Sequence, residues 1–468
     1  MKKFILLTIL AIYSIGQVKA QSWKCPENIR IPEFKSSDCF LLKAPLNYDS
    51  DNTEKIDLFV RKFPAKRKRK GSIWLIPGGP GESGATLYPL INQFSELFPH
   101  MDIFIPDHRG TGYSSKICPK EEIVDSPGGM ALSNDEWGPC FNYMYSNPNY
   151  AKAFTITNAA KDLSLLINEL SGQGERYIYG VSYGTQLVLR LLQLGTTNLD
   201  AVILDSLVPL QDDEKYDLSR RSFITNEVGL SFLQKLDETF PNHISIREQL
   251  KNVIERAEKD QEFANQLPKQ DLTILFGMML DIPYVRSKIP EIIKSLNKGD
   301  FKPLQNSIAK ITSFYQEYGA NYQSSPNSIP LTQIITASET NLRPDITKAN
   351  VAQESRELLF KSPLPNLIAE NTMSTYKRDN YFGKIPKQMP PTLILHGNLD
   401  PKTHIEGARK HYKVLKQENP SISFIEINSA PHFIALFAPN VFRKAVREFI
   451  RKKSIEDQTM NEKTLSFK

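Results

Sequence analysis

The 468-residue sequence predicts an α/β fold: a mostly parallel central sheet with an inserted helical cap domain. Short apolar, strand-type runs alternate with helix-type runs up to Asp205, which is typical of a parallel sheet covered by helices. About 180 residues without this alternation follow, and it resumes near Ile385. A serine flanked by glycines stands between one of the strand-type runs and the helix-type run after it.

The amino end has the three parts of a secretory signal in residues 1–20. Two lysines precede an apolar run over residues 4–12, and Val18-Lys19-Ala20 is a small-x-small cleavage site. The apolar run is too short to span a membrane comfortably. We therefore expect a secreted or periplasmic protein without stable membrane insertion.

The four cysteines agree with export, since disulfides persist in oxidising compartments. Cys25 and Cys39 are close in sequence, as are Cys118 and Cys140. Four cysteines allow three pairings, and we expect the local pairs 25–39 and 118–140. Four unpaired thiols are the alternative, which an oxidising compartment disfavours.

The first core strands are expected over residues 56–63 and 72–76, with the basic run 66–70 (K-R-K-R-K) between them. We interpret this run as a solvated hairpin turn. The net charge of +6 is modest for this length, and no basic surface interleaved with aromatic residues is visible. Nucleic acid is therefore not an expected partner.

A glycine-rich loop, residues 77–84 (P-G-G-P-G-E-S-G), follows the strand 72–76. Glycines let backbone N–H groups approach a developing oxyanion, so we expect one donor from Gly78 or Gly79. The next strand, 102–106, leads into D-H-R-G-T-G. Asp107 and Arg109 are interpreted there as scaffold groups that fix the loop.

Residues 180–184 read G-V-S-Y-G, between a strand-type run at 176–179 and a helix-type run at 185–194. A strand that turns sharply into a helix at a serine is the nucleophile elbow of α/β-hydrolases. Ser182 is therefore the predicted nucleophile, and the N–H of Tyr183 is the second expected oxyanion donor.

The layout divides the chain into a core at 21–206, a helical cap at 207–384, a second core part at 385–452 and a polar tail at 453–468. The cap is expected between two sheet strands, where it shapes substrate access. Its helices are predicted over residues 212–236, 246–261, 272–279, 289–296 and 303–318.

The partners of the serine are expected after the last two core strands. Asp400 follows the strand-type run 391–395, and His432 follows the run 423–427. An imidazole must take the serine proton, and a carboxylate must orient the imidazole, in the chain order Ser, Asp, His. Asp205, at another strand end, is the alternative acid, although a structural hydrogen bond suits it better. No H-E-x-x-H or C-x-x-C spacing occurs, so we expect neither a metal nor a cofactor.

The motifs G-G-P-G-E-S-G, D-H-R-G-T-G-Y-S, G-V-S-Y-G-T, G-N-L-D-P and A-P-H together resemble the prolyl and tripeptidyl aminopeptidase family of serine α/β-hydrolases. The resemblance covers roughly residues 55–210 and 385–450. It implies cofactor-free cleavage of one or a few residues from peptide amino ends. By matching positions, it assigns the triad to Ser182, Asp400 and His432.

Exopeptidases of this kind hold the substrate ammonium with an anion, usually from the cap. The resemblance extends to residues 334–340, where Glu339 is the candidate for amine recognition. The function expected is that of a secreted serine exopeptidase acting on peptide substrates. A carboxylesterase on the same fold and a catalytically inactive secreted binding protein are the alternatives.

Overall fold

The computed structural model describes residues 20–26, 32–50, 53–123, 126, 132–239, 244–269, 271–320 and 327–465. The expected secretory signal therefore lies outside the described residues, apart from Ala20. None of the helices in these ranges has the length and apolar character that crossing a membrane requires.

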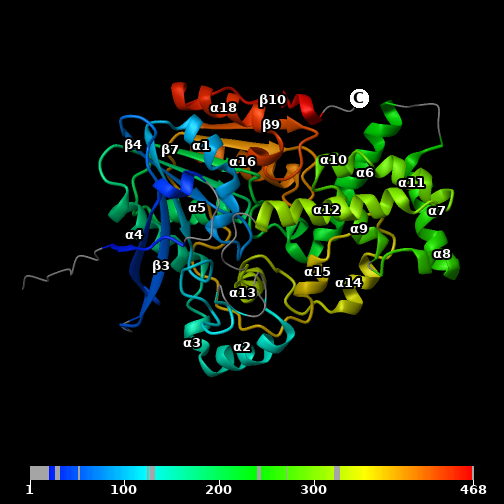
Figure 1. Cartoon of the computed structure of the whole chain (residues 1–468), viewed down its shortest axis with the longest axis horizontal. Helices are drawn as coiled ribbons and strands as arrows, with labels where there is room; N and C mark the ends of the chain where they lie inside the picture. The colour runs from blue at the N-terminus through cyan, green and yellow to red at the C-terminus, as the bar shows by residue number, and fades with distance from the viewer. Residues whose placement is uncertain are drawn as a thin grey trace, which may run out of the picture.

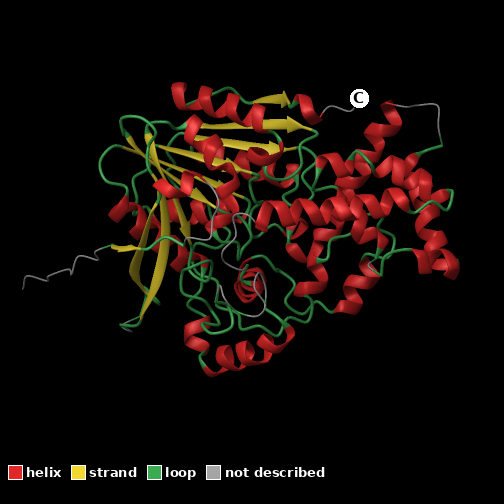
Figure 2. Ribbon diagram, viewed as in Figure 1, coloured by secondary structure: helices red, strands yellow, loops and turns green. Residues whose placement is uncertain are grey.

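The described residues form one ten-stranded sheet in the order β1-β2-β3-β5-β4-β6-β7-β8-β9-β10 (Figures 1 and 2). The strands from β5 to β10 in this order are parallel, while β1, β2 and β3 add an antiparallel edge. The predicted fold class is confirmed. The strands are β1 (Gln21–Trp23), β2 (Asp38–Pro45), β3 (Lys55–Phe63), β4 (Gly71–Ile76), β5 (Met101–Asp107), β6 (Glu175–Val181), β7 (Ala201–Asp205), β8 (Thr392–Gly397), β9 (Ile422–Asn428) and β10 (Gln458–Asn461).

The basic run 66–70 does not form the expected hairpin turn. Strands β3 and β4 are not neighbours, because β5 lies between them and pairs with both. The run is instead part of a connection that passes over β5. There Arg69 Nε lies 2.8 Å from a carboxylate oxygen of Asp102, and its guanidinium also donates to the carbonyls of Ser171 and Gln173. The hairpin prediction was wrong because sequence adjacency does not fix strand pairing.

Helices cover both faces of the sheet, as the alternation of buried side chains along β4 requires. Ile73 and Leu75 pack with α1 and α18 on one face. Trp74 and Ile76 pack with α4, α5 and α16 on the other. The core helices are α1 (Ile91–Leu97), α2 (Asn134–Ser146), α3 (Pro148–Ala151), α4 (Ile156–Leu170), α5 (Tyr183–Leu194), α16 (Ile405–Glu418), α17 (Ile434–Phe437) and α18 (Pro439–Lys452).

Between β7 and β8 the described residues form helices and no strand, and most of these helices stack beside the sheet (Figure 1). They have an apolar core of their own around Phe232, Phe276 and Leu296. This packing explains why their sequence has buried positions without strand alternation. The helices are α6 (Arg221–Thr239), α7 (Ile246–Lys259), α8 (Gln261–Gln266), α9 (Leu272–Met279), α10 (Pro283–Arg286), α11 (Ile289–Asn297), α12 (Lys302–Ala320), α13 (Ile329–Glu339), α14 (Lys348–Glu354) and α15 (Leu364–Ile368).

The two ends of the described chain are fastened to the sheet. Disulfides join Cys25 to Cys39 and Cys118 to Cys140, the local pairing expected from the sequence. At the other end, the polar tail contributes β10, which runs parallel to β9 with Met460 opposite Ile427. This part of the tail therefore belongs to the fold, because β10 forms the edge of the sheet.

Candidate active site

Ser182 stands at the sharp turn between β6 and α5, with φ 55° and ψ −124°. This conformation is rare for a residue with a side chain and marks a strained turn. The flanking glycines are required sterically. A Cβ at Gly180 would lie 2.6 Å from the carbonyl oxygen of Gly184, and one at Gly184 would lie 2.6 Å from that of Ile76. The sequence therefore raises the serine above the carboxyl end of β6.

Asp400 and His432 meet beyond the carboxyl ends of β8 and β9. The Nδ1 atom of His432 lies 2.8 Å from Oδ2 of Asp400. Asp400 is fully buried and accepts the N–H groups of Lys402 and Thr403 at 2.7 and 2.8 Å. Burial alone would raise the pKa of Asp400, but the adjacent imidazole of His432 holds it well below its usual range. The carboxylate therefore stays ionised and fixes the ring.

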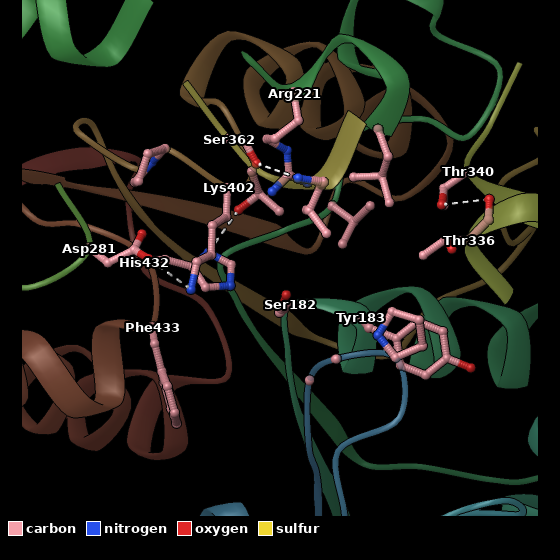
Figure 3. Close-up of a pocket in the computed structure, with 18 of the residues that line it drawn as sticks. Ser182, Tyr183, Arg221, Asp281, Thr336, Thr340, Ser362, Lys402, His432 and Phe433 are labelled. Atoms are coloured by element: carbon pink, nitrogen blue, oxygen red, sulfur yellow. Dashed lines mark hydrogen bonds and ion pairs between the residues drawn. The ribbon is translucent and has the colours of Figure 1, made fainter. Parts of the chain in front are cut away.

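His432 and Ser182 line the same cavity, and Figure 3 shows the imidazole and the serine hydroxyl within it. The carboxylate of Asp400 lies behind the imidazole ring, in contact with Nδ1 rather than exposed to the cavity. This arrangement leaves Nε2 as the ring nitrogen available on the cavity side. Nucleophilic catalysis by serine needs its general base on this side of the ring, facing the serine.

Asp205, the alternative acid, occupies a different position. Its two carboxylate oxygens accept the N–H groups of Ile434 and Ala435, each at 2.8 Å, and the hydroxyls of Tyr179 and Ser206. These bonds hold the first turn of α17, just after His432. No bond to His432 is present among them. Asp205 therefore makes the structural hydrogen bonds that the sequence analysis favoured for it over a role as triad acid.

The three candidates for the two oxyanion donors, Gly78, Gly79 and Tyr183, all line the cavity. Tyr183 is the first residue of α5, so its N–H has no acceptor within the helix. A Cβ at Gly78 would lie 3.2 Å from Cβ of Ser182, which places that loop directly against the elbow. Gly79 has φ 107°, a conformation that favours glycine. The choice between Gly78 and Gly79 stays open.

Asp107 and Arg109 have the scaffold contacts that the sequence suggested. Asp107 accepts the N–H groups of Gly84 at 2.7 Å and Tyr113 at 2.9 Å. Arg109 makes a two-point contact with Asp162 at 2.6 and 2.7 Å and also donates to three backbone carbonyls. Asp107 thus ties the glycine-rich loop to the end of β5, and Arg109 anchors the next turn.

The cavity has a volume of about 710 Å³ and is enclosed by both the core and the cap. The core supplies the serine, the histidine and the glycine-rich loop, while the cap supplies α6, α9, α12, α13 and the segment before α15. This volume is in the range of small-molecule and short-peptide sites. Its apolar wall includes Val208, Leu218, Phe314, Ile335, Leu364, Phe433 and Phe437.

Residues 71–439 match the family described as the alpha/beta hydrolase fold. The chain belongs to this family. The serine protease Hip1 of Mycobacterium tuberculosis is 27% identical over an alignment of 188 residues that covers 36% of each chain. Carboxylesterase B of the same organism is 33% identical over 101 residues, covering 20% of this chain and 19% of its own. These matches span about a third or less of either relative's length.

Among solved structures, a thermophilic esterase from Thermogutta terrifontis aligns with 88% of this chain and 99% of its own at 16% identity and a TM-score of 0.40. The family match supports a serine hydrolase. A fold does not by itself define a substrate, so the substrate depends on the residues of the cavity.

The cavity contains one acidic residue, Glu82, to which the sequence motifs assigned no role. Glu82 belongs to the glycine-rich loop and lines the cavity. A Cβ at Gly78 would lie 3.3 Å from Oε2 of Glu82, on a loop that touches Ser182. Burial raises the pKa of Glu82, while Lys402 and His432 oppose the rise. The signal available was an acidic residue within an otherwise small-residue loop.

Glu339, the amine-binding candidate, is not brought into the cavity. It ends α13 and is buried, with its carboxylate accepting from Gln211 at 2.8 Å and Tyr376 at 3.0 Å. Arg190 lies 3.5 Å away as an ionic partner. Glu339 is absent from the residues that line the cavity. Its role in amine recognition stays a prediction, and its present contacts are those of a scaffold group.

The described residues contain no group of three His, Cys, Asp or Glu side chains arranged to hold a metal ion.

Proposed function

We propose that the protein is a serine exopeptidase that removes one or a few residues from the amino end of peptides. The observation that carries the proposal is the strained Ser182 in one cavity with His432, whose Nδ1 is held by Asp400. In this mechanism the Ser182 hydroxyl attacks the carbonyl carbon while His432 takes its proton. The carbonyl oxygen becomes negative and binds the N–H of Tyr183 and that of Gly78 or Gly79.

The tetrahedral intermediate then collapses. The C–N bond breaks, His432 returns the proton to the leaving amine, and the amino-terminal part remains as an ester on Ser182. Water attacks this ester with His432 again as the base, which releases the acyl group and restores the serine. Asp400 stabilises the imidazolium in both steps.

Recognition of the free amine is assigned to Glu82 in this proposal. It is the acidic side chain of the loop that touches the elbow, it lines the cavity, and its carboxylate accepts a hydrogen bond from the backbone of Gly78. An ammonium group beside Glu82 would favour the ionised carboxylate, against the burial that raises its pKa. Glu339 is a weaker candidate, because Arg190, Gln211 and Tyr376 already engage it.

The test compares a peptide amide that has a free amino end with the same peptide acetylated there. We expect the wild type to hydrolyse the free-amine peptide at least tenfold faster, as the loss of one charged hydrogen bond implies. Glu82→Gln should lower this preference towards unity. Glu96→Gln, which removes an exposed carboxylate of α1, is the matched control and should keep it. Equal turnover of the two peptides by the wild type would defeat the exopeptidase proposal.

A carboxylesterase is the second candidate, favoured by the apolar wall of the cavity and the partial similarity to Carboxylesterase B. Short acyl esters without an amino group discriminate the two. If they are hydrolysed well and free-amine peptides are not, the esterase is the better description. An inactive binding protein would show no reaction of Ser182 with a fluorophosphonate.

We also propose that the enzyme acts outside the cytoplasm. Two disulfides and the expected signal at residues 1–20 support this. Fractionation of the natural host, followed by mass spectrometry of the mature amino end, tests it. Recovery of the full-length chain in the cytoplasm would contradict it.

A further inference from the structure

Arg221 is a positively charged side chain of the cavity without a direct partner. It is the first residue of α6 and lines the cavity, where Figure 3 shows it beside Ser362 on the wall above Ser182. Its guanidinium has no hydrogen bond or ion pair with any residue in the described part of the chain. The other two lysine and arginine side chains of the lining are paired: Lys402 with Asp281 at 3.2 Å and Lys361 with Asp271 at 3.5 Å.

The carboxylates nearest to Arg221, those of Asp217, Asp281 and Asp400, already bind other groups. Asp217 accepts the N–H groups of Ser219 and Leu342. Asp281 pairs with Lys402, and Asp400 holds His432. Arg109 differs from Arg221 in this respect. It supports the fold, and its guanidinium donates hydrogen bonds to Asp162 and to three backbone carbonyls.

The guanidinium remains charged at neutral pH. Burial lowers the pKa of Arg221 to about 10, which still leaves it protonated. Arg221 is half-buried, and a charge held partly out of water without a partner is unfavourable, since charges inside folded proteins are normally paired. An anionic group that enters the cavity would supply the missing partner.

Arg221 lies on an element that packs against the turn containing Asp400. The hydroxyl of Thr225, one turn further along α6, lies 3.0 Å from the carbonyl of Arg221 and 3.4 Å from that of Pro401. Pro401 directly follows Asp400, so the start of α6 rests on the turn that orients His432. An anion at Arg221 would therefore be close to a substrate bound at Ser182.

We propose that Arg221 binds the carboxyl-terminal carboxylate of a short peptide substrate. The inference rests on the proposed exopeptidase function and extends it from the amino end of the substrate to its other end. The planar guanidinium matches a carboxylate with two parallel N–H donors. Because Ser182 and Arg221 line one cavity of about 710 Å³, a peptide that reaches both must be short. The enzyme would thus be selective for small peptides over protein amino ends.

The experiment measures kcat/KM on two tripeptides of one uncharged sequence, both with a free amino end, one ending in a carboxylate and the other in an amide. We expect the wild type to prefer the acid by about 10- to 100-fold, as a charge-assisted two-point contact implies. Arg221→Gln should remove this preference by slowing the acid and leave the amide within about twofold. Arg221→Lys should keep part of it, since it retains the charge without the fork.

Arg220→Gln is the matched control, because it deletes the same charge one residue away and outside the cavity lining. It should preserve the preference for the acid. Melting temperatures of all three variants identify any that fail to fold, and Arg221→Lys then carries the test. Equal rates for acid and amide in the wild type, or an equal loss of both in Arg221→Gln, would overturn the inference. The inference would also be overturned if Arg220→Gln abolished the preference for the acid, because the loss would then not be specific to Arg221.

A third peptide, amidated at its carboxyl end and carrying a glutamate, identifies the source of the carboxylate. If this peptide is preferred as strongly as the free acid, Arg221 binds an acidic side chain. The proposal that it binds the carboxyl-terminal carboxylate is then overturned. The amide also reports on the exopeptidase function separately, because it needs no carboxylate. If the wild type hydrolyses neither tripeptide, that function fails, and calorimetric titration of both into wild type and Arg221→Gln decides the inference. Tighter binding of the acid, lost in the variant, supports it; equal or absent binding overturns it.

Discussion

Two fully buried aspartates lie at or just beyond the carboxyl ends of the neighbouring strands β7 and β8, and their carboxylates bind different groups. Asp205, at the end of β7, accepts two backbone N–H groups of α17 and two hydroxyls. Asp400, after β8, accepts two backbone N–H groups of its own turn, the hydroxyl of Thr403 and Nδ1 of His432. The first carboxylate fixes the backbone that follows His432, and the second fixes its ring.

The difference shows that burial and position at a strand end do not by themselves distinguish the proposed catalytic acid from a structural carboxylate. The deciding feature is a titratable partner that faces the cavity. Asp400 has one in His432, while the partners of Asp205 are backbone amides and hydroxyls that exchange no proton in the reaction. Mutations that remove charge but keep shape separate the two roles.

Asp400→Asn should have the largest effect on activity. The amide NH₂ would face Nδ1 of His432 and force the ring into the wrong tautomer, as in other serine hydrolases where this change lowers kcat about 10⁴-fold. Steady-state rates on a free-amine peptide measure it. A loss of tenfold or less would remove Asp400 from the triad.

Asp205→Asn should affect stability rather than chemistry. Each carboxylate oxygen of Asp205 accepts one N–H of α17, and an amide nitrogen accepts none, so one buried donor loses its partner. The expected cost is about 1–3 kcal/mol of unfolding free energy, measured by urea denaturation. Activity per folded molecule should stay within about tenfold of the wild type. A variant of unchanged stability that is inactive would reverse the assignment of the two aspartates.

Thr403→Val tests how firmly Asp400 must be held. The Thr403 hydroxyl donates to Oδ2 of Asp400 at 2.7 Å and lies 3.2 Å from Nδ1 of His432. Loss of this donor to a charged group should reduce kcat by about tenfold, and Thr403→Ser should restore most of it. If valine and serine have the same kcat, the hydroxyl has no role in orienting the pair.

His396 gives the smallest expected effect, on the acid side of the stability profile. It lies 3.7 Å from Asp400, and burial lowers its pKa to about 4 from 6.5. The unfolded chain therefore takes up the proton first, so the stability due to neutral His396 is complete above pH 6.5 and is lost as the pH falls to 4. Melting temperatures between pH 7 and 4 should fall less steeply in His396→Gln than in the wild type. Parallel curves would contradict this account of His396.

Much of this architecture can be predicted from short stretches of the sequence. The elbow at Ser182 depends on its two glycines and on the strand and helix beside it, so a window of a few residues predicts it. Asp400 and His432 follow strand-type runs whose carboxyl ends must meet at one edge of a parallel sheet. Chain order therefore places the three residues together before any contact is known.

The misses have a common physical reason, because each depends on contacts between distant segments. The hairpin expected around residues 66–70 failed because β5 pairs with both β3 and β4. The amine-binding role of Glu339 stays a prediction, but the contacts of its carboxylate with Arg190 and Tyr376, far from it in the chain, could not be predicted from the sequence. Arg221 carries no motif at all. Only the packing of α6 on the turn after Asp400 places it in the cavity.

The most direct test of the central claim is the rate at which a fluorophosphonate modifies Ser182 in the wild type, Asp400→Asn and Asp205→Asn. Peptide mapping locates the adduct. Ser182 is predicted to be modified rapidly in the wild type and in folded Asp205→Asn, and slower by orders of magnitude in Asp400→Asn. Modification of a different residue, or a reaction that depends on Asp205 and not on Asp400, would contradict the assignment of Ser182, His432 and Asp400 as the catalytic groups.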